Sequence, residues 1–232
     1  MRKLLALADV QGKIERLREV LDAEATSVDA VALVGDLAAP WSLKGNHREI
    51  LQALGRLERP AFWVPGRNDA PLRRFLQESH NAELVHPLLH GVHGTYATAP
   101  GGGVVAGIGG EIVDEPETVR AEDFLLRYAG WEAEYRLKLL SELDEQPTVL
   151  LFATPPEHKG LGDPGSQVVA ELIKLHAPRV AVVGGGAARQ ERLARTLVVC
   201  PGRLADGDYA LVDLQAATVE PRHLPEPAAV AT

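Results

Sequence analysis

Residues 8–13 (ADVQGK), 34–37 (VGDL) and 64–69 (VPGRND) each join an apolar run to a turn that carries a carboxylate. Between them lie stretches 13–23 and 48–57, in which apolar residues recur at helical spacing. Strands that alternate with helices in this way predict a parallel sheet with helical crossovers. Ligand sites in such sheets form at the carboxyl ends of the strands. We therefore expect the three carboxylate turns to meet at one edge of a parallel sheet.

The rest of the chain continues an α/β pattern. Strands are predicted at 4–8, 30–34, 61–64, 149–152, 180–183, 197–199 and 209–214. A long helix is predicted at 122–143, a loop and helix at 164–175, and short antiparallel strands within the Gly- and His-rich stretch 82–110. We expect a single domain over 1–220 and a disordered tail over the Pro- and Ala-rich segment 221–232.

The length of 232 residues favours one large α/β domain over two small ones, and a hydrophobic fraction of 46% is ample for a sizeable core. The formal net charge is −8, from 24 basic and 32 acidic residues, so we expect neither nucleic acid nor an anionic membrane as a partner. The single cysteine, Cys200, excludes an intramolecular disulfide. The apolar run near residue 4 is too short for a signal peptide or a membrane span, so we expect a soluble cytoplasmic protein.

The order and spacing of the three turns resemble those of the calcineurin-like metallophosphoesterases. That family's pattern is Asp-x-His, Gly-Asp, Gly-Asn-His-Asp or Glu, a lone His, and Gly-His-x-His. The resemblance runs from about residue 4 to 214. It implies a four-layer α/β/β/α sandwich of two mixed sheets. It also implies two metal ions that activate a water and stabilise the attacking and leaving oxygens of a phosphoester.

The early motifs keep their carboxylates and lose their other ligands. Asp9 and Asp36 match the family's metal-binding aspartates, but Gln11 stands where the first motif has histidine. Arg67 replaces the metal-binding Asn, and Asn68 replaces the catalytic His. Asn has no pKa near neutrality, so Asn68 cannot protonate a leaving group as histidine does. Asp69, which in the family orients that histidine, is left without it.

The later motifs lose their imidazoles as well. Alignment on Pro155 and Pro156 puts Ala153 at the lone-histidine position, and alignment on Gly184 puts Gly185 and Ala187 in place of the last two histidines. The resemblance therefore implies the family's fold without its two-metal chemistry. It leaves either no metal or one weakly bound divalent cation (Mg, Mn or Ca), held by Asp9, Asp36 and Gln11, since oxygen ligands favour hard cations.

The converging aspartates need a counter-charge, because carboxylates ~4 Å apart repel by roughly 4 kcal/mol at an effective dielectric near 20. We expect Arg67 to pair with Asp9 or Asp36 where an ion stands in the family. The alternative is that both aspartates only cap helices and that Arg67 is a surface residue.

Several other residues are weaker candidates. His158 is a possible substitute imidazole, and Glu111 could reach the edge of the site or only stabilise a turn. The glycine triplet 184–186, followed by a stretch 187–195 that could be helical, would suit an anion, although the pattern favours an ordinary tight loop. The histidines at 86, 90 and 93 read as loop residues. Trp131 and Tyr135 belong to the core or to a subunit contact.

Three functions remain open from the sequence. The first is a pseudoenzyme whose degenerate site binds a small phosphorylated or anionic ligand, or a partner. The second is a surviving phosphoesterase that hydrolyses a phosphomonoester or phosphodiester with one cation at Asp9 and Asp36, with Asp69, Asn68 or His158 as catalytic candidates. The third is a scaffold that forms a homo-oligomer.

Overall fold

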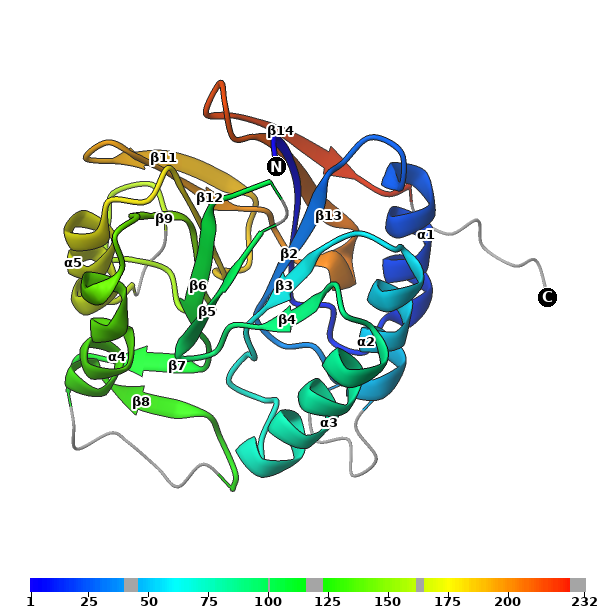
Figure 1. Cartoon of the computed structure of the whole chain (residues 1–232), viewed down its shortest axis with the longest axis horizontal. Helices are drawn as coiled ribbons and strands as arrows, with labels where there is room; N and C mark the ends of the chain where they lie inside the picture. The colour runs from blue at the N-terminus through cyan, green and yellow to red at the C-terminus, as the bar shows by residue number, and fades with distance from the viewer. Residues whose placement is uncertain (40–45, 100, 116–122, 162–164, 226–232) are drawn as a thin grey trace.

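The computed structural model describes residues 1–39, 46–99, 101–115, 123–161 and 165–225. Two six-stranded mixed sheets pack face to face, and helices cover the outer face of each (Figure 1). This is the expected α/β/β/α sandwich of two mixed sheets. Among the described residues, no helix reaches the length and hydrophobicity that crossing a lipid bilayer requires.

The first sheet has the order β14-β13-β1-β2-β3-β4. Its strands are β1 (Lys3–Ala8), β2 (Ala30–Val34), β3 (Ala61–Trp63), β4 (Leu89–Gly91), β13 (Asp208–Asp213) and β14 (Thr218–His223). The outer face is covered by α1 (Ile14–Glu24), α2 (His47–Arg56) and α3 (Leu72–Val85). Strands β1 to β4 run parallel, so the turns after β1, β2 and β3 emerge at one edge.

The second sheet has the order β11-β12-β10-β9-β6-β5. Its strands are β5 (Thr95–Thr98), β6 (Val104–Ile108), β9 (Pro147–Phe152), β10 (Val180–Val183), β11 (Arg189–Leu193) and β12 (Thr196–Cys200). Its outer layer holds α4 (Gly130–Leu137), the 3-10 helix η2 (Lys138–Glu142) and α5 (Gln167–His176). The pair β7 (Glu111–Val113) and β8 (Arg127–Ala129) forms a small parallel sheet, and a second 3-10 helix, η3 (Leu204–Asp206), follows β12.

The buried residues form three clusters, one at each interface between the four layers. One cluster packs α1, α2 and α3 against the first sheet, for example Leu17, Ile50 and Phe75. Another lies between the sheets, and a third packs α4 and α5 against the second sheet. Strand β1 alternates between the first two clusters, with Leu5 facing the helices and Ala6 facing the other sheet. This two-sided burial is why the strand reads as a continuous apolar run.

Several predicted elements differ in the structure. The helix expected at 122–143 is shorter, because residues 127–129 form β8 and α4 begins at Gly130; residue 122 lies outside the described residues. The stretch expected to contain only antiparallel strands includes the end of α3, and β4 pairs in parallel with β3. The stretch 187–195 holds strand β11, not a helix. Apolar spacing is ambiguous in short segments, and strand pairing decides them.

The boundary placed at residue 220 is too early. Strand β14 continues to His223 and pairs antiparallel with β13, and Leu224 is buried at 6% exposure. This pairing satisfies the backbone hydrogen-bonding groups of β14. The Pro- and Ala-rich composition of the segment gave no sign of such a strand. Residues 226–232 lie outside the described residues.

Candidate functional site

A pocket of about 860 Å³ opens where the carboxyl ends of the parallel strands meet. Its walls include Asp9 after β1, Asp36 after β2, Asn68 after β3, Ala153 after β9 and Gly185 after β10. The carboxylate turns of the first sheet thus face the glycine turn of the second. This is the strand-end placement expected for a ligand site in an α/β fold.

Asp9 is held in a left-handed turn (φ 49°) that follows β1 directly. Its Oδ1 accepts a hydrogen bond from the backbone N of Asp36 at 3.0 Å. A Cβ at Gly35 would lie 2.1 Å from that oxygen, so the close approach of the two turns requires glycine there. Burial raises the pKa of Asp9 from 3.8 to about 6, and the charges of Asp36 and Asp69 add to the rise, while the Asp36 hydrogen bond and Arg203 oppose it.

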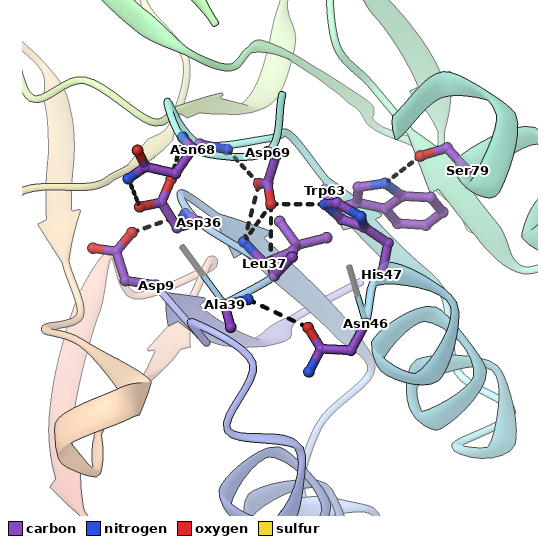
Figure 2. Close-up of polar contacts among 12 residues, drawn as sticks. Asp9, Asp36, Leu37, Ala39, Asn46, His47, Trp63, Asn68, Asp69 and Ser79 are labelled. Atoms are coloured by element: carbon purple, nitrogen blue, oxygen red, sulfur yellow. Dashed lines mark hydrogen bonds and ion pairs between the residues drawn. The ribbon is translucent and has the colours of Figure 1, made fainter. Parts of the chain in front are cut away.

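Asp36 is bound through both of its oxygens by a single residue. The backbone N of Asn68 donates to Oδ1 at 2.9 Å, and Nδ2 of Asn68 donates to Oδ2 at 2.7 Å. Figure 2 shows Asp9, Asp36 and Asn68 grouped together on one side of the turns. Burial and the nearby charge of Asp69 raise the pKa of Asp36, while the Asn68 hydrogen bonds and Arg67 lower it.

Asp69 is a structural anchor outside the pocket lining. It is fully buried and accepts hydrogen bonds from the backbone N of Leu37, Ala38 and Gly66. The sequence suggested that it had no histidine to orient, which is wrong, because Nε2 of His47 lies 2.8 Å from its Oδ1 (Figure 2). Asp69 therefore ties the turns after β2 and β3 to the start of α2. His47 had no motif signal, since it comes from outside the three turns.

Arg67 was expected to pair with Asp9 or Asp36, but it pairs with Glu111 instead. Its Nη1 lies 3.2 Å from Oε2 of Glu111, and Nη2 of Arg127 lies 2.6 Å from the same oxygen. Glu111 belongs to β7 and Arg127 to β8, so the small sheet draws Arg67 away from the aspartates. All three residues line the pocket, and the Arg67 side chain remains 45% exposed.

Arg203 is a pocket residue that the sequence motifs did not indicate. It follows the Cys-Pro-Gly turn at 200–202, its charge lowers the pKa of Asp9, and its side chain is 48% exposed. Its Nε also contacts Asp206 at 2.8 Å. The Cys-Pro-Gly turn could have indicated Arg203 in the sequence, because it places the side chain that follows it at the strand ends.

Other predicted site residues divide between the pocket and its surroundings. Gln11 lines the pocket, and its backbone N donates to the carbonyl of Asp36 at 2.9 Å. Ala153 and Gly185 also line it, whereas Ala187 and His158 are absent from the lining. A Cβ at Gly186 would meet no atom within 4 Å, so the glycine turn leaves open space on this side. Because β11 follows this turn, no helix N-terminus supports an anion here.

Helix capping does not explain the two aspartates. The N-cap of α1 is Lys13 and that of α2 is Asn46, and neither makes a side-chain capping hydrogen bond. Among the described residues, no group of three or more His, Cys, Asp or Glu side chains is placed to hold a metal ion. His90 and His93 serve local packing, stacked on Phe62 and bonded to the N of Gly109 respectively.

The two packed sheets and the strand-end carboxylates define a fold of the metallophosphoesterase class. A family model described as metallophosphoesterase, calcineurin superfamily, matches residues 1–224, and the chain belongs to this family. No curated protein matches the chain.

Solved structures share the fold. The crystal structure of TT1561 of Thermus thermophilus is 41% identical, with a TM-score of 0.89, and the match covers 96% of this chain and 98% of that one. A second crystal structure is 29% identical with a TM-score of 0.85, covering 97% of this chain and 99% of the other. An archaeal phosphodiesterase, 12% identical with a TM-score of 0.56 and covering 96% and 99% of the two chains, shares the fold.

Proposed function

We propose that this protein binds a small phosphorylated or anionic ligand in the strand-end pocket and has weak or no two-metal phosphoester hydrolysis. The observation that carries the proposal is the double hydrogen bond from Asn68 to Asp36. By the family resemblance, the carboxylate at Asp36 would bridge two metals. Here protein donors satisfy both of its oxygens, and the residue in the place of the catalytic histidine supplies them.

The remaining side chains do not fit a two-metal centre. Asp69, at the end of the third motif, is fully buried and turned toward backbone donors and His47. Ala153 and Gly185 provide no side chain that could bind a metal on the opposite wall. Divalent transition metals in proteins favour imidazole, thiolate or carboxylate ligands, and only Asp9 and Asp36 provide these at the turns. These turns therefore offer too few ligands for a metal pair.

The charged residues of the pocket lining are five carboxylates and three arginines, and the arginines are the groups that could hold an anion. Arg67 and Arg203 line it and are each about half exposed. The planar guanidinium group can form paired hydrogen bonds with phosphate or carboxylate oxygens. Two of the lining carboxylates have partners of their own: Glu111 contacts Arg67 and Arg127, and Asp114 accepts hydrogen bonds from Ser166 and from the backbone N of Gln167.

A second candidate function is hydrolysis with a single hard cation at Asp9, Asp36 and Gln11. The raised pKa of Asp9, about 6, supports it, because a buried carboxylate beside a second one gains from a cation that offsets both charges. Asn68 cannot act as the general acid, and His158 is absent from the pocket lining. Any such activity would therefore lack the family's proton donor.

A hydrolysis assay separates these candidates. Purified protein is assayed on bis-p-nitrophenyl phosphate and p-nitrophenyl phosphate with Mn²⁺, Mg²⁺ or Ca²⁺, beside an Asp36→Ala variant. If the protein only binds a ligand, its turnover should be indistinguishable from that of Asp36→Ala. Turnover that needs the cation and disappears in Asp36→Ala would establish the single-cation enzyme instead.

A binding measurement tests the ligand class directly. Calorimetric titration of EDTA-treated protein with inorganic phosphate should give saturable binding without added metal. Absence of binding to phosphate and to a phosphomonoester such as glycerol phosphate would contradict the proposal. The same titration with Mn²⁺ present shows whether a cation is needed first.

A further inference from the structure

A second pocket, of about 970 Å³, lies in the outer helical layer of the second sheet. Its walls come from α4, η2, the segment before β9 and α5, and it shares no lining residue with the strand-end pocket. Figure 1 shows α4 and α5 side by side in this layer, on the opposite side of the molecule from α1. The pocket is therefore independent of the proposed ligand site.

Large apolar side chains are exposed around this pocket. Trp131 is 63% exposed, and Tyr135 and Leu175 are each 73% exposed. Leu140 and Leu172 lie buried beneath them and also line the pocket. Single exposed apolar residues are ordinary, but two aromatics and a leucine gathered over one hollow are typical of a binding surface. Exposed Trp and Tyr are also the residues that dominate the energy of protein interfaces.

The rim of the pocket is acidic. Its charged lining residues are Glu134, Asp144, Glu145, Glu171 and Lys138, which sum to −3. His176 also lines the pocket, but burial lowers its pKa, so it adds no positive charge at neutral pH. An acidic rim beside exposed aromatic side chains attracts a cation, because carboxylates and aromatic faces both favour positive charge.

We propose that this second pocket docks a basic peptide segment of a partner protein, in which Lys or Arg side chains accompany apolar ones. The apolar side chains would cover Trp131, Tyr135 and Leu175, and the cations would meet the acidic rim. A second copy of the chain is a poor occupant. A two-fold contact would press one acidic rim against another, and the chain carries a net charge of −8.

The test uses a fluorescent, helical peptide of Leu and Lys with one apolar face, and anisotropy measures its affinity. We expect saturable binding that Trp131→Ala weakens by about tenfold, as at an interface hot spot. Glu171→Lys should weaken it by about fivefold at low salt. Because Trp131 and Glu171 are both exposed, thermal unfolding should confirm that the variants remain folded.

Matched controls distinguish the pocket from general charge attraction. Glu19→Lys changes the net charge by the same amount as Glu171→Lys. It lies at an exposed position of α1, in the opposite outer layer, and should leave peptide affinity unchanged. The same peptide with Glu in place of Lys should not bind. Equal weakening by Glu19→Lys, or binding of the Glu peptide, would overturn the proposal. Self-association that Trp131→Ala abolishes would overturn it in favour of a second copy.

Discussion

Asn68 donates one hydrogen bond to each oxygen of Asp36, from the backbone N at 2.9 Å and from Nδ2 at 2.7 Å. If the resemblance to the family's motifs holds at these two positions, a residue in the place of a histidine holds a carboxylate in the place of a metal ligand. This pairing also accounts for how Asp36 remains in a buried site beside Asp9 and Asp69, whose charges oppose its own.

Asn68→Ala should raise the pKa of Asp36, because it removes the donor from Oδ2 and leaves only the backbone bond. Arg67→Ala should raise the same pKa by less, since Arg67 is paired with Glu111 and acts on Asp36 only at a distance. Carboxyl-carbon NMR titration measures both. An unchanged pKa in Asn68→Ala would show that the side-chain bond does not matter.

Asp9→Asn should stabilise the protein at neutral pH. The pKa of Asp9 rises from 3.8 to about 6 on folding, so ionising this group in the folded state costs up to about 3 kcal/mol above pH 6. Below pH 3.8 the group is protonated in both states and the cost disappears. Asparagine keeps an acceptor for the N of Asp36 and tolerates φ 49°.

Urea unfolding in EDTA from pH 4 to pH 8 checks this pH dependence. The gain of Asp9→Asn over the wild type should grow from pH 4 to pH 6 and then level off. Asp22→Asn, on the exposed face of α1, serves as the control and should give no such rise. A gain that is largest at pH 4 would reverse the predicted sign.

Asp69→Asn should destabilise the fold by about 3 kcal/mol or more, the cost of breaking a buried charged network. Asp69 accepts from the N of Leu37, Ala38 and Gly66 and from His47, and an amide NH₂ would face some of these donors. Asp206→Asn removes an exposed pair with Arg203 and should change stability by less than about 1 kcal/mol. Similar losses in the two variants would argue against the anchor role of Asp69.

The alternation of buried strands and helices predicted an α/β fold with a parallel sheet, and the four-layer arrangement was predicted from the resemblance of the turns to the metallophosphoesterase family. The sequence predicted the positions of Asp9, Asp36 and Gln11 in the pocket because turns after parallel strands share one edge. It could not assign the partner of Arg67, since Glu111 and Arg127 reach the pocket from the small β7–β8 sheet. The apolar spacing predicts a helix over the residues of β8, so that small sheet had no sequence signal.

The arginines should set the affinity for anions. Arg67→Ala and Arg203→Ala should each weaken phosphate binding by roughly tenfold, since hydrogen bonds to charged groups contribute about 1.5–3 kcal/mol. Arg195→Ala, exposed in the β11–β12 turn and outside the pocket, should leave binding unchanged. Equal affinity in all three variants would place the anion elsewhere on the molecule.

Metal stoichiometry tests the central claim most directly. The protein is purified without chelator, equilibrated with Mn²⁺, passed through a desalting column and analysed by elemental mass spectrometry, with Asp9→Asn/Asp36→Asn as the control. We predict at most one equivalent, lost on dilution, because Asn68 and the N of Asp36 already occupy oxygens of both aspartates. Two tightly retained equivalents that the double variant loses would contradict the account.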